Sequence, residues 1–160
     1  MLWITREQVL AGRRSTAWYQ LDALARSRDA ATRLRVAKNP SAQTDALWVL
    51  SRDDDAEVRE QVARRTDAPK KLLSKLSQDS SSDVRAAVAR NETTSAEVLR
   101  SMAEDPHHGV RFAVQASQRQ RRRAADERAE AVTEREAELD EQDDERGRGA
   151  AAAQPLAATA

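Results

Sequence analysis

The sequence repeats itself every 26 residues. Arginines recur at this interval, valines follow each of them three residues later, and leucines keep the same spacing. The recurring positions are Arg33, Arg59, Arg85 and Arg111; Val36, Val62, Val88 and Val114; and Leu21, Leu47, Leu73 and Leu99. A fixed period of this size is typical of stacked supersecondary units that bury only the faces touching their neighbours. A hydrophobic content of 39% with 3% aromatic residues is thin for a closed globule, but it suffices for such a solenoid.

Each unit predicts two short helices separated by a turn. In the unit that starts at Asp67, this residue is placed to cap the first helix, and Pro69 suits its first turn. The apolar stripe of that helix comprises Leu72, Leu73 and Leu76. A second helix follows the serine-rich segment 78–82, with apolar positions at Val84, Ala87 and Val88. Neither helix is long enough to be stable alone, so stacking must stabilise both, and the shorter one is either α or 3₁₀.

The N-terminus begins with half a unit. Thr5 and Gln8 have the spacing of a capping box, and Leu10 falls in register with Val36. Glu7 stands in the place of the periodic arginine, and such departures are normal in a terminal repeat. We therefore predict an all-α fold, a short right-handed α-solenoid, over residues 1–117. It comprises a half-repeat cap at 1–14 and repeats at about 15–40, 41–66, 67–92 and 93–117.

A second periodic residue stands six positions before most of the arginines. The pairs are Asp53 with Arg59, Asp79 with Arg85, and Asp105 with Arg111, whereas Ser27 precedes Arg33. This spacing places a carboxylate in the turn between helices and a guanidinium in the first turns of the next helix. We expect charge-assisted hydrogen bonds within or between units, which would form a structural ladder. The alternative is that the same arginines contact DNA phosphates.

Neither metal binding nor catalysis is indicated. The absence of cysteine excludes disulfides, thiolate metal sites and iron–sulfur clusters. The run Asp53 to Asp55 is better explained by a ladder acid at Asp53 and a helix cap at Asp54, and His107 and His108 lack a spaced third ligand. No nucleophile–base pair, paired carboxylates or glycine-rich phosphate loop is present. We expect no enzymatic activity, no cofactor and no metal.

One stretch carries a recognisable motif. Asp79 is followed, after four residues, by Val84-Arg85-Ala86-Ala87-Val88-Ala89-Arg90-Asn91, and one period later come Asp105-Pro106 and Val110-Arg111. This pattern resembles the leucine-rich repeat variant family over residues 15–117, and the resemblance implies a right-handed superhelix of alternating α- and 3₁₀-helices. The Asp-to-Arg spacing is also similar to HEAT repeats, whose paired helices use a comparable polar ladder. The period of 26 is longer than is usual in the first family, which leaves paired α-helices open, and without cysteines no iron–sulfur function carries over.

A basic stripe is expected on the second helices. In HEAT-like stacks the second helix of each pair lines the concave face, which by analogy exposes the residues two after each periodic valine. These residues are Lys38, Arg64 and Arg90. Neighbouring helices lie about 8–10 Å apart, so the three cations would form a row suited to an acidic peptide or a phosphate backbone. The alternative is an ordinary solvated face, compensated by Glu57, Glu60 and Asp83.

Trp48 is a further candidate for partner binding. Its equivalents in the next two repeats are Ser74 and Arg100, so the position does not require burial. An exposed Trp48 would anchor a partner. The alternative is that it packs over the Trp18-Tyr19 region and seals the N-terminal units.

The repeat stops at Gln118. Residues 119–123 contain Arg119, Arg121, Arg122 and Arg123 without an acid, and residues 126–146 carry 11 acids. We predict a charged helical extension at 118–146, with Ala125, Val132 and Leu139 at heptad spacing, and a disordered alanine-rich tail at 147–160. A further hypothesis is that the acidic arm folds back on the basic stripe.

These patterns favour a non-catalytic protein-interaction or scaffold module that binds a partner protein on its concave helical surface. The alternative is a nucleic-acid-binding repeat protein that uses the stripe and the arginine-rich segment 119–123. A HEAT-like DNA-repair enzyme is the least supported function, because no catalytic constellation is present.

The same sequence predicts where the protein resides. No apolar run approaches the roughly 20 residues of a membrane span, and the first seven residues do not resemble a signal peptide. We expect a cytoplasmic protein. The preference for Arg over Lys, together with the many alanines, is typical of a GC-rich genome and favours a bacterial source.

Overall fold

The computed structural model describes residues 4–152, with the side chains of residues 4–136 and of Leu139. Within this range the chain is all-helical, as predicted, and contains no strand. The helices are α1 (Arg6–Gly12), α2 (Trp18–Leu24), α3 (Ala30–Lys38), α4 (Thr44–Leu50), α5 (Ala56–Ala63), α6 (Lys70–Leu76), α7 (Ser82–Arg90), α8 (Ala96–Ser101) and α9 (His108–Ala152). Both helices of each pair are α, which answers the question of 3₁₀ geometry. The right-handed sense of the stack stays a prediction.

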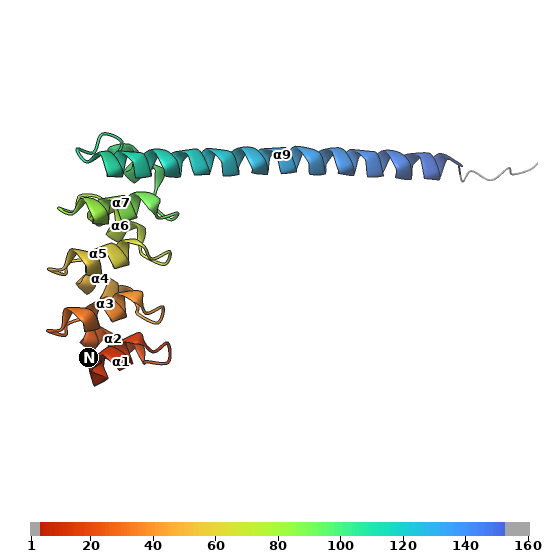
Figure 1. Cartoon of the computed structure of the whole chain (residues 1–160). Coiled ribbons are helices and arrows are strands. Elements are labelled where there is room, and N and C mark those ends of the chain that lie inside the picture. Colours follow the sequence, from red (N-terminus) through yellow and green to blue (C-terminus); the bar gives the residue numbers. More distant parts are fainter. Residues whose placement is uncertain (1–3, 153–160) are drawn as a thin grey trace, which may run out of the picture. The chain divides into compact units, whose positions relative to one another are not determined.

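The helices are arranged as stacked pairs, one above the next in Figure 1. The second helices form a continuous row, because α3 packs against α1 and α5, and α5 packs against α7. The first helices α2, α4 and α6 flank this row, and each contacts the second helix of its own pair. Helix α1 therefore occupies the place of a second helix in this row.

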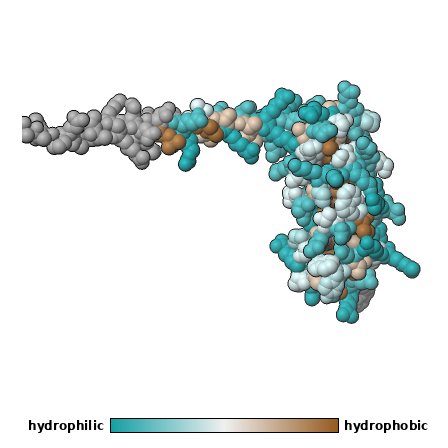
Figure 2. Space-filling view, turned by 180° about the vertical axis from the view of Figure 1, so that it is seen from behind, coloured by the Kyte–Doolittle hydropathy of each residue, from teal (hydrophilic) through white to brown (hydrophobic). Residues whose placement is uncertain are grey.

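One continuous core runs through the pairs. Its fully buried side chains are the periodic apolar residues, including Leu21, Leu47, Leu73, Leu99, Val36, Val62, Val88 and Val114. Residues of α8 and of the start of α9, such as Met102 and Val110, belong to the same core. The face of these pairs seen in Figure 2 is mostly hydrophilic or neutral, as expected when apolar side chains lie between neighbouring helices.

The helix starts follow local hydrogen bonding, with two corrections to the expected caps. Thr5 and Gln8 form the predicted capping box on α1. Helix α5 is capped by Asp55 and not by Asp54, because Asp55 directly precedes the helix and accepts from the Glu57 N–H. Helix α6 begins after Pro69 without a side-chain cap, because the carboxylate of Asp67 binds Arg65 instead.

The chain divides into two compact units, Met1–Gln118 and Arg119–Ala160. In the second unit, α9 continues as a charged helix whose described side chains are almost all exposed. The helix extends through residues 147–152, where we expected the disordered tail to begin. Alanines 150–152 have the highest helix propensity, and adding residues to an existing helix needs no new nucleus. The rest of the predicted tail, 153–160, lies outside the described residues, and no described helix is long and apolar enough to cross a membrane.

Replacing Leu73 by Ala should destabilise the solenoid. Leu73 is fully buried between α6 and its neighbours, so the truncation removes apolar contact and leaves a cavity. We expect a loss of about 2–5 kcal/mol in the free energy of unfolding, measured by urea denaturation. The adjacent Ser74→Ala, at an exposed position, is the control and should change stability by less than about 0.5 kcal/mol. Equal effects of the two variants would contradict the assignment of the core.

Candidate interaction surface

The periodic arginines link each repeat to the next one. Each guanidinium forms a bidentate pair with an aspartate 20 residues further along the chain. The pairs are Arg33 with Asp53, Arg59 with Asp79, and Arg85 with Asp105, with Nε–Oδ2 distances of 2.6, 2.8 and 2.7 Å and Nη2–Oδ1 distances of 2.9 Å. The predicted pairs with a spacing of six are made through the backbone: Nη1 of Arg59 donates to the carbonyl of Asp53 at 2.7 Å. The carboxylates of the aspartates thus pair with the arginine of the preceding repeat, whereas their backbone carbonyls accept hydrogen bonds from the arginine of their own repeat.

These rungs are shielded from solvent. The aspartate side chains are 4–8% exposed and the arginine side chains 13–17%. Burial alone would raise the pKa of Asp53, but the hydrogen bonds from Arg33 and from the Asp55 N–H hold that pKa below its ordinary value. The pKa of Asp105 is lowered mainly by its hydrogen bonds with Arg85. The Arg59 guanidinium makes four hydrogen bonds to acceptors of the protein itself, which favours the structural role over phosphate contact.

The first rung of the ladder is reversed. Glu7 stands in place of an arginine, and Ser27 stands 20 residues later in place of an aspartate. The Ser27 hydroxyl donates to Glu7 Oε2 at 3.0 Å, so the acceptor and the donor have exchanged sides. The two departures from the repeat pattern are therefore a matched pair.

A second ladder was missed by the sequence reasoning. Asn39 Nδ2 donates to the carbonyls of Ala11 and Arg13, both at 2.8 Å. Asn91 Nδ2 makes the same contacts 52 residues later, to the carbonyls of Ala63 and Arg65 at 2.7 Å. The recurrence of Asn39 and Asn91 at twice the period was the available signal. It was hidden because the residue midway between them, Arg65, is of another type.

Arg65 replaces asparagine in this second ladder. Its Nη1 donates to the carbonyls of Ala37 and Asn39, the same two register positions that the asparagines use. The longer guanidinium also donates from Nη2 to the Ala42 carbonyl and forms a bidentate pair with Asp67. This pair outweighs burial, which by itself would raise the pKa of Asp67, and holds that pKa below its ordinary value. Arg65 is thus a buried structural residue and contributes no free positive charge to the surface.

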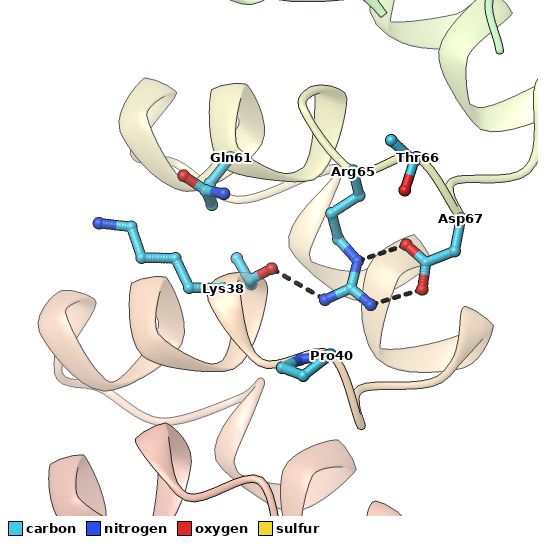
Figure 3. Close-up of a pocket in the computed structure, with 7 residues that line it drawn as sticks. Lys38, Pro40, Gln61, Arg65, Thr66 and Asp67 are labelled. Carbon is cyan, nitrogen blue, oxygen red and sulfur yellow. Dashed lines mark hydrogen bonds and ion pairs between the residues drawn. The ribbon is translucent and has the colours of Figure 1, made fainter. Parts of the chain in front are cut away.

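A hollow of about 310 Å³ lies beside this pair, between the ends of α3 and α5. Figure 3 shows Lys38 and Gln61 along one side and the Arg65–Asp67 pair, with Pro40 below it, on the other. The hydrogen-bond donors of Arg65 are all engaged. The polar groups that the hollow offers to a ligand include the exposed Lys38 ammonium, the exposed Thr66 hydroxyl and the half-exposed amide of Gln61.

The three predicted stripe residues occupy equivalent places. Lys38 and Arg90 are the last residues of α3 and α7, Arg64 directly follows α5, and all three are exposed. Because α3, α5 and α7 pack in sequence, the cations follow one another along this row. Arg64 binds Glu60 at 2.6 Å, yet its side chain is still 59% exposed. An exposed pair of this kind contributes little to stability, so a partner could displace it at low cost.

Trp48 has a mixed environment. It lies in α4, is half-buried and packs against the hydrophobic core. Trp18 and Tyr19 remain more than half exposed, and their rings meet edge to face with centroids 6.0 Å apart. Trp48 therefore contributes to packing without sealing the Trp18–Tyr19 region. Part of its surface stays accessible, and its role in partner binding stays a prediction.

Among the described side chains, no three His, Asp or Glu groups gather closely enough to hold a metal ion. Asp53 is engaged by Arg33 and by the Asp55 N–H. His107 and His108 stack on each other with centroids 5.0 Å apart. Both features are accounted for by packing and hydrogen bonding.

Replacing Asp53 by Asn should weaken the stack in a pH-dependent way. The change removes one charge of a shielded rung and should cost about 2–4 kcal/mol at pH 7. Because the folded-state pKa of Asp53 lies below 3.8, its contribution is complete above that value and is lost as the pH falls through the folded-state pKa. The difference between wild type and variant, measured by urea denaturation, should therefore shrink on acidification. The exposed neighbour Asp54, changed to Asn, is the matched control and should show neither effect.

Replacing Arg65 by Asn should be tolerated better than replacing it by Ala. Asparagine at this position can donate to the carbonyls of Ala37 and Asn39, as Asn39 and Asn91 do in their own repeats. Alanine leaves these buried carbonyls without a donor, which should cost at least about 2 kcal/mol. Thermal and urea unfolding of the two variants would measure the difference. Equal stability of both would contradict the second ladder.

Residues 83–107 match the leucine rich repeat variant family. The matched segment contains both members of the last complete rung, Arg85 and Asp105, and the whole of α8. No curated protein and no solved structure matches the chain. The matched family is a non-catalytic repeat module of the kind that mediates protein interaction or scaffolding. Over this segment the chain is similar to the family that the motif from Asp79 to Asn91 indicated.

Proposed function

We propose that this protein is a non-catalytic interaction module whose second-helix row binds an acidic segment of a partner protein. The observation that carries the proposal is the exposed stripe of Lys38, Arg64 and Arg90. It follows the packed row α3, α5 and α7, so a partner in an extended or helical conformation would meet one cation in each repeat.

The contrast with the two ladders supports this assignment. The arginines of the rungs and Arg65 are shielded and engaged by acceptors within the protein. The stripe cations recur with the same period but are solvent-exposed, and Lys38 borders the hollow at the end of α3. A row of exposed like charges raises the local concentration of an oppositely charged partner and accelerates its association.

Nucleic-acid binding is the second candidate function. Arg119, Arg122 and Arg123 are exposed on consecutive turns of α9, and no acid lies between residues 118 and 125. This segment could neutralise phosphates. Few aromatic side chains are available for base stacking, which disfavours single-stranded nucleic acid relative to duplex.

Reversing the charge of the stripe should abolish partner binding. The test variant carries Lys38→Glu, Arg64→Glu and Arg90→Glu. Its matched control carries Lys70→Glu, Lys71→Glu and Lys75→Glu, an equal charge change on exposed residues of α6. A partner captured by the full chain and then purified should bind the stripe variant at least about tenfold more weakly by titration calorimetry. Its affinity for the control variant should match that for wild type.

A titration with duplex DNA at two salt concentrations separates the two candidate functions. Submicromolar binding to duplex DNA with a steep salt dependence would favour the nucleic-acid function. Equal partner affinity of the stripe variant and the α6 variant would contradict the proposed surface, whatever the partner is.

A further inference from the structure

The last arginine of the ladder lacks its carboxylate. Arg33, Arg59 and Arg85 each present Nε and Nη2 to an aspartate of the following repeat. Arg111 donates from Nη1 to the carbonyls of Asp105 and Pro106, as the other arginines do within their own repeats. No carboxylate among the described residues forms an ion pair with its Nε and Nη2 edge. The residue 20 positions after Arg111 is Ala131, so the chain supplies no acid at the ladder spacing.

The neighbouring residue is an uncovered aromatic. Phe112 is 68% exposed, although it lies in the first turns of α9 beside the core residue Val110. Its equivalents one, two and three periods earlier are Ala86, which is buried, and Glu60 and Leu34, which are half-buried. These equivalents belong to repeats that have a following repeat. Phe112 belongs to the last one, so its exposure marks the open end of the stack.

The three complete rungs define what would fit this end. In each, the aspartate that meets the arginine also accepts from the backbone N–H two residues later, with Oδ1–N distances of 2.9–3.0 Å. These acceptor and donor pairs are Asp53 with Asp55, Asp79 with Ser81, and Asp105 with His107. Each of these turns leads directly into a helix. The complement of Arg111 is therefore an aspartate in a tight turn at the start of a helix.

We propose that Arg111 and Phe112 form an end face that docks a partner protein through an aspartate-led helix start. The partner's carboxylate would receive Nε and Nη2 of Arg111, and an apolar residue of the same segment would cover Phe112. Bidentate pairing needs both oxygens in the guanidinium plane, which gives this face directional specificity. This face shares no residue with the stripe of Lys38, Arg64 and Arg90. It would recognise a partner by bidentate pairing and apolar contact, whereas the stripe offers separate exposed cations.

A second copy of this chain is a poorer fit. Stacked head to tail in register, it would present its first second-type helix, α1, to the end face. The residue six positions before Glu7, where the ladder places its aspartate, is Met1. The reversed rung of Glu7 and Ser27 likewise has no carboxylate to offer at the aspartate position. In this register a second copy therefore offers no aspartate at the ladder position, which favours a partner of different sequence.

The test uses the full chain and a peptide that copies a known complement. The peptide spans residues 78–91 of this sequence, carries Asp79 and the start of α7, and is stapled to hold it helical, which lowers the ordering cost of binding. The control peptide contains Asn in place of Asp79. Addition of the peptide to ¹⁵N-labelled protein should shift the Arg111 Nε–H resonance, and the control peptide should bind at least about tenfold more weakly.

Protein variants decide between specific docking and plain charge attraction. Arg111→Lys keeps the charge but loses the planar fork, and we expect affinity for the peptide to fall at least about tenfold. Phe112→Ala should weaken it about fivefold. The stripe variant with Glu at 38, 64 and 90 should bind the peptide like wild type, which separates this face from the proposed function.

Three results would overturn the proposal. They are an unshifted Arg111 resonance at millimolar peptide, equal binding of both peptides, and full affinity of the Arg111→Lys protein. Sedimentation equilibrium provides the remaining check. Self-association of the full chain that disappears in Arg111→Lys would assign the end face to a second copy and exclude a foreign partner.

Discussion

The bidentate ion pair between successive repeats is the interaction on which this architecture depends. Outside α9 the helices contain six to nine residues, a length that is marginal in isolation. Apolar packing supplies most of the driving force, but it does not by itself set the register between neighbouring pairs. The rung of Arg59 and Asp79 does, because its two oxygens and two nitrogens meet in one plane only. Asn39, Arg65 and Asn91 add a second row of directional bonds between repeats.

The two ladders also divide the charges of the protein into two groups. Arginines that recur in the rungs, together with Arg65, are committed to holding the stack and have few free donors. Lys38, Arg64 and Arg90 recur with an equal period but lie at helix ends, where their charge faces solvent and suits the negative end of the helix dipole. Periodicity alone therefore does not distinguish a structural cation from one that can recognise a partner. Burial and acceptor geometry do.

Much of the fold could be predicted from the sequence, because a period of 26 constrains helix count, core and stacking together. The partners within the polar rows could not. Each interior arginine of the ladder has one aspartate six residues before it and another 20 residues after it, as Arg59 has Asp53 and Asp79. Both spacings recur with the period, so spacing alone does not tell which carboxylate pairs with the guanidinium. The structural role of Arg65 could not be predicted from the repeat pattern, because the equivalent residues one period away are asparagines. Both residue types can nevertheless donate to the equivalent pair of carbonyls in the preceding repeat. The predicted helix caps at Asp54 and Asp67 were wrong for a similar reason. Which acid caps a helix depends on which of its neighbours is engaged elsewhere, as Asp53 is by the Asp55 N–H and Asp67 is by Arg65.

Each ion pair joins one repeat to the next, which determines how a chain of this kind can gain or lose repeats. Every internal repeat contributes an arginine to the next unit and an aspartate to the previous one. Duplicating or deleting 26 residues inside the array therefore regenerates complete rungs at the new junction without any other substitution. The half-repeat of Glu7 lacks this property, since the residue six positions before Glu7, where the ladder places its aspartate, is Met1. The number of interior repeats can therefore change while every junction between them keeps its ion pair.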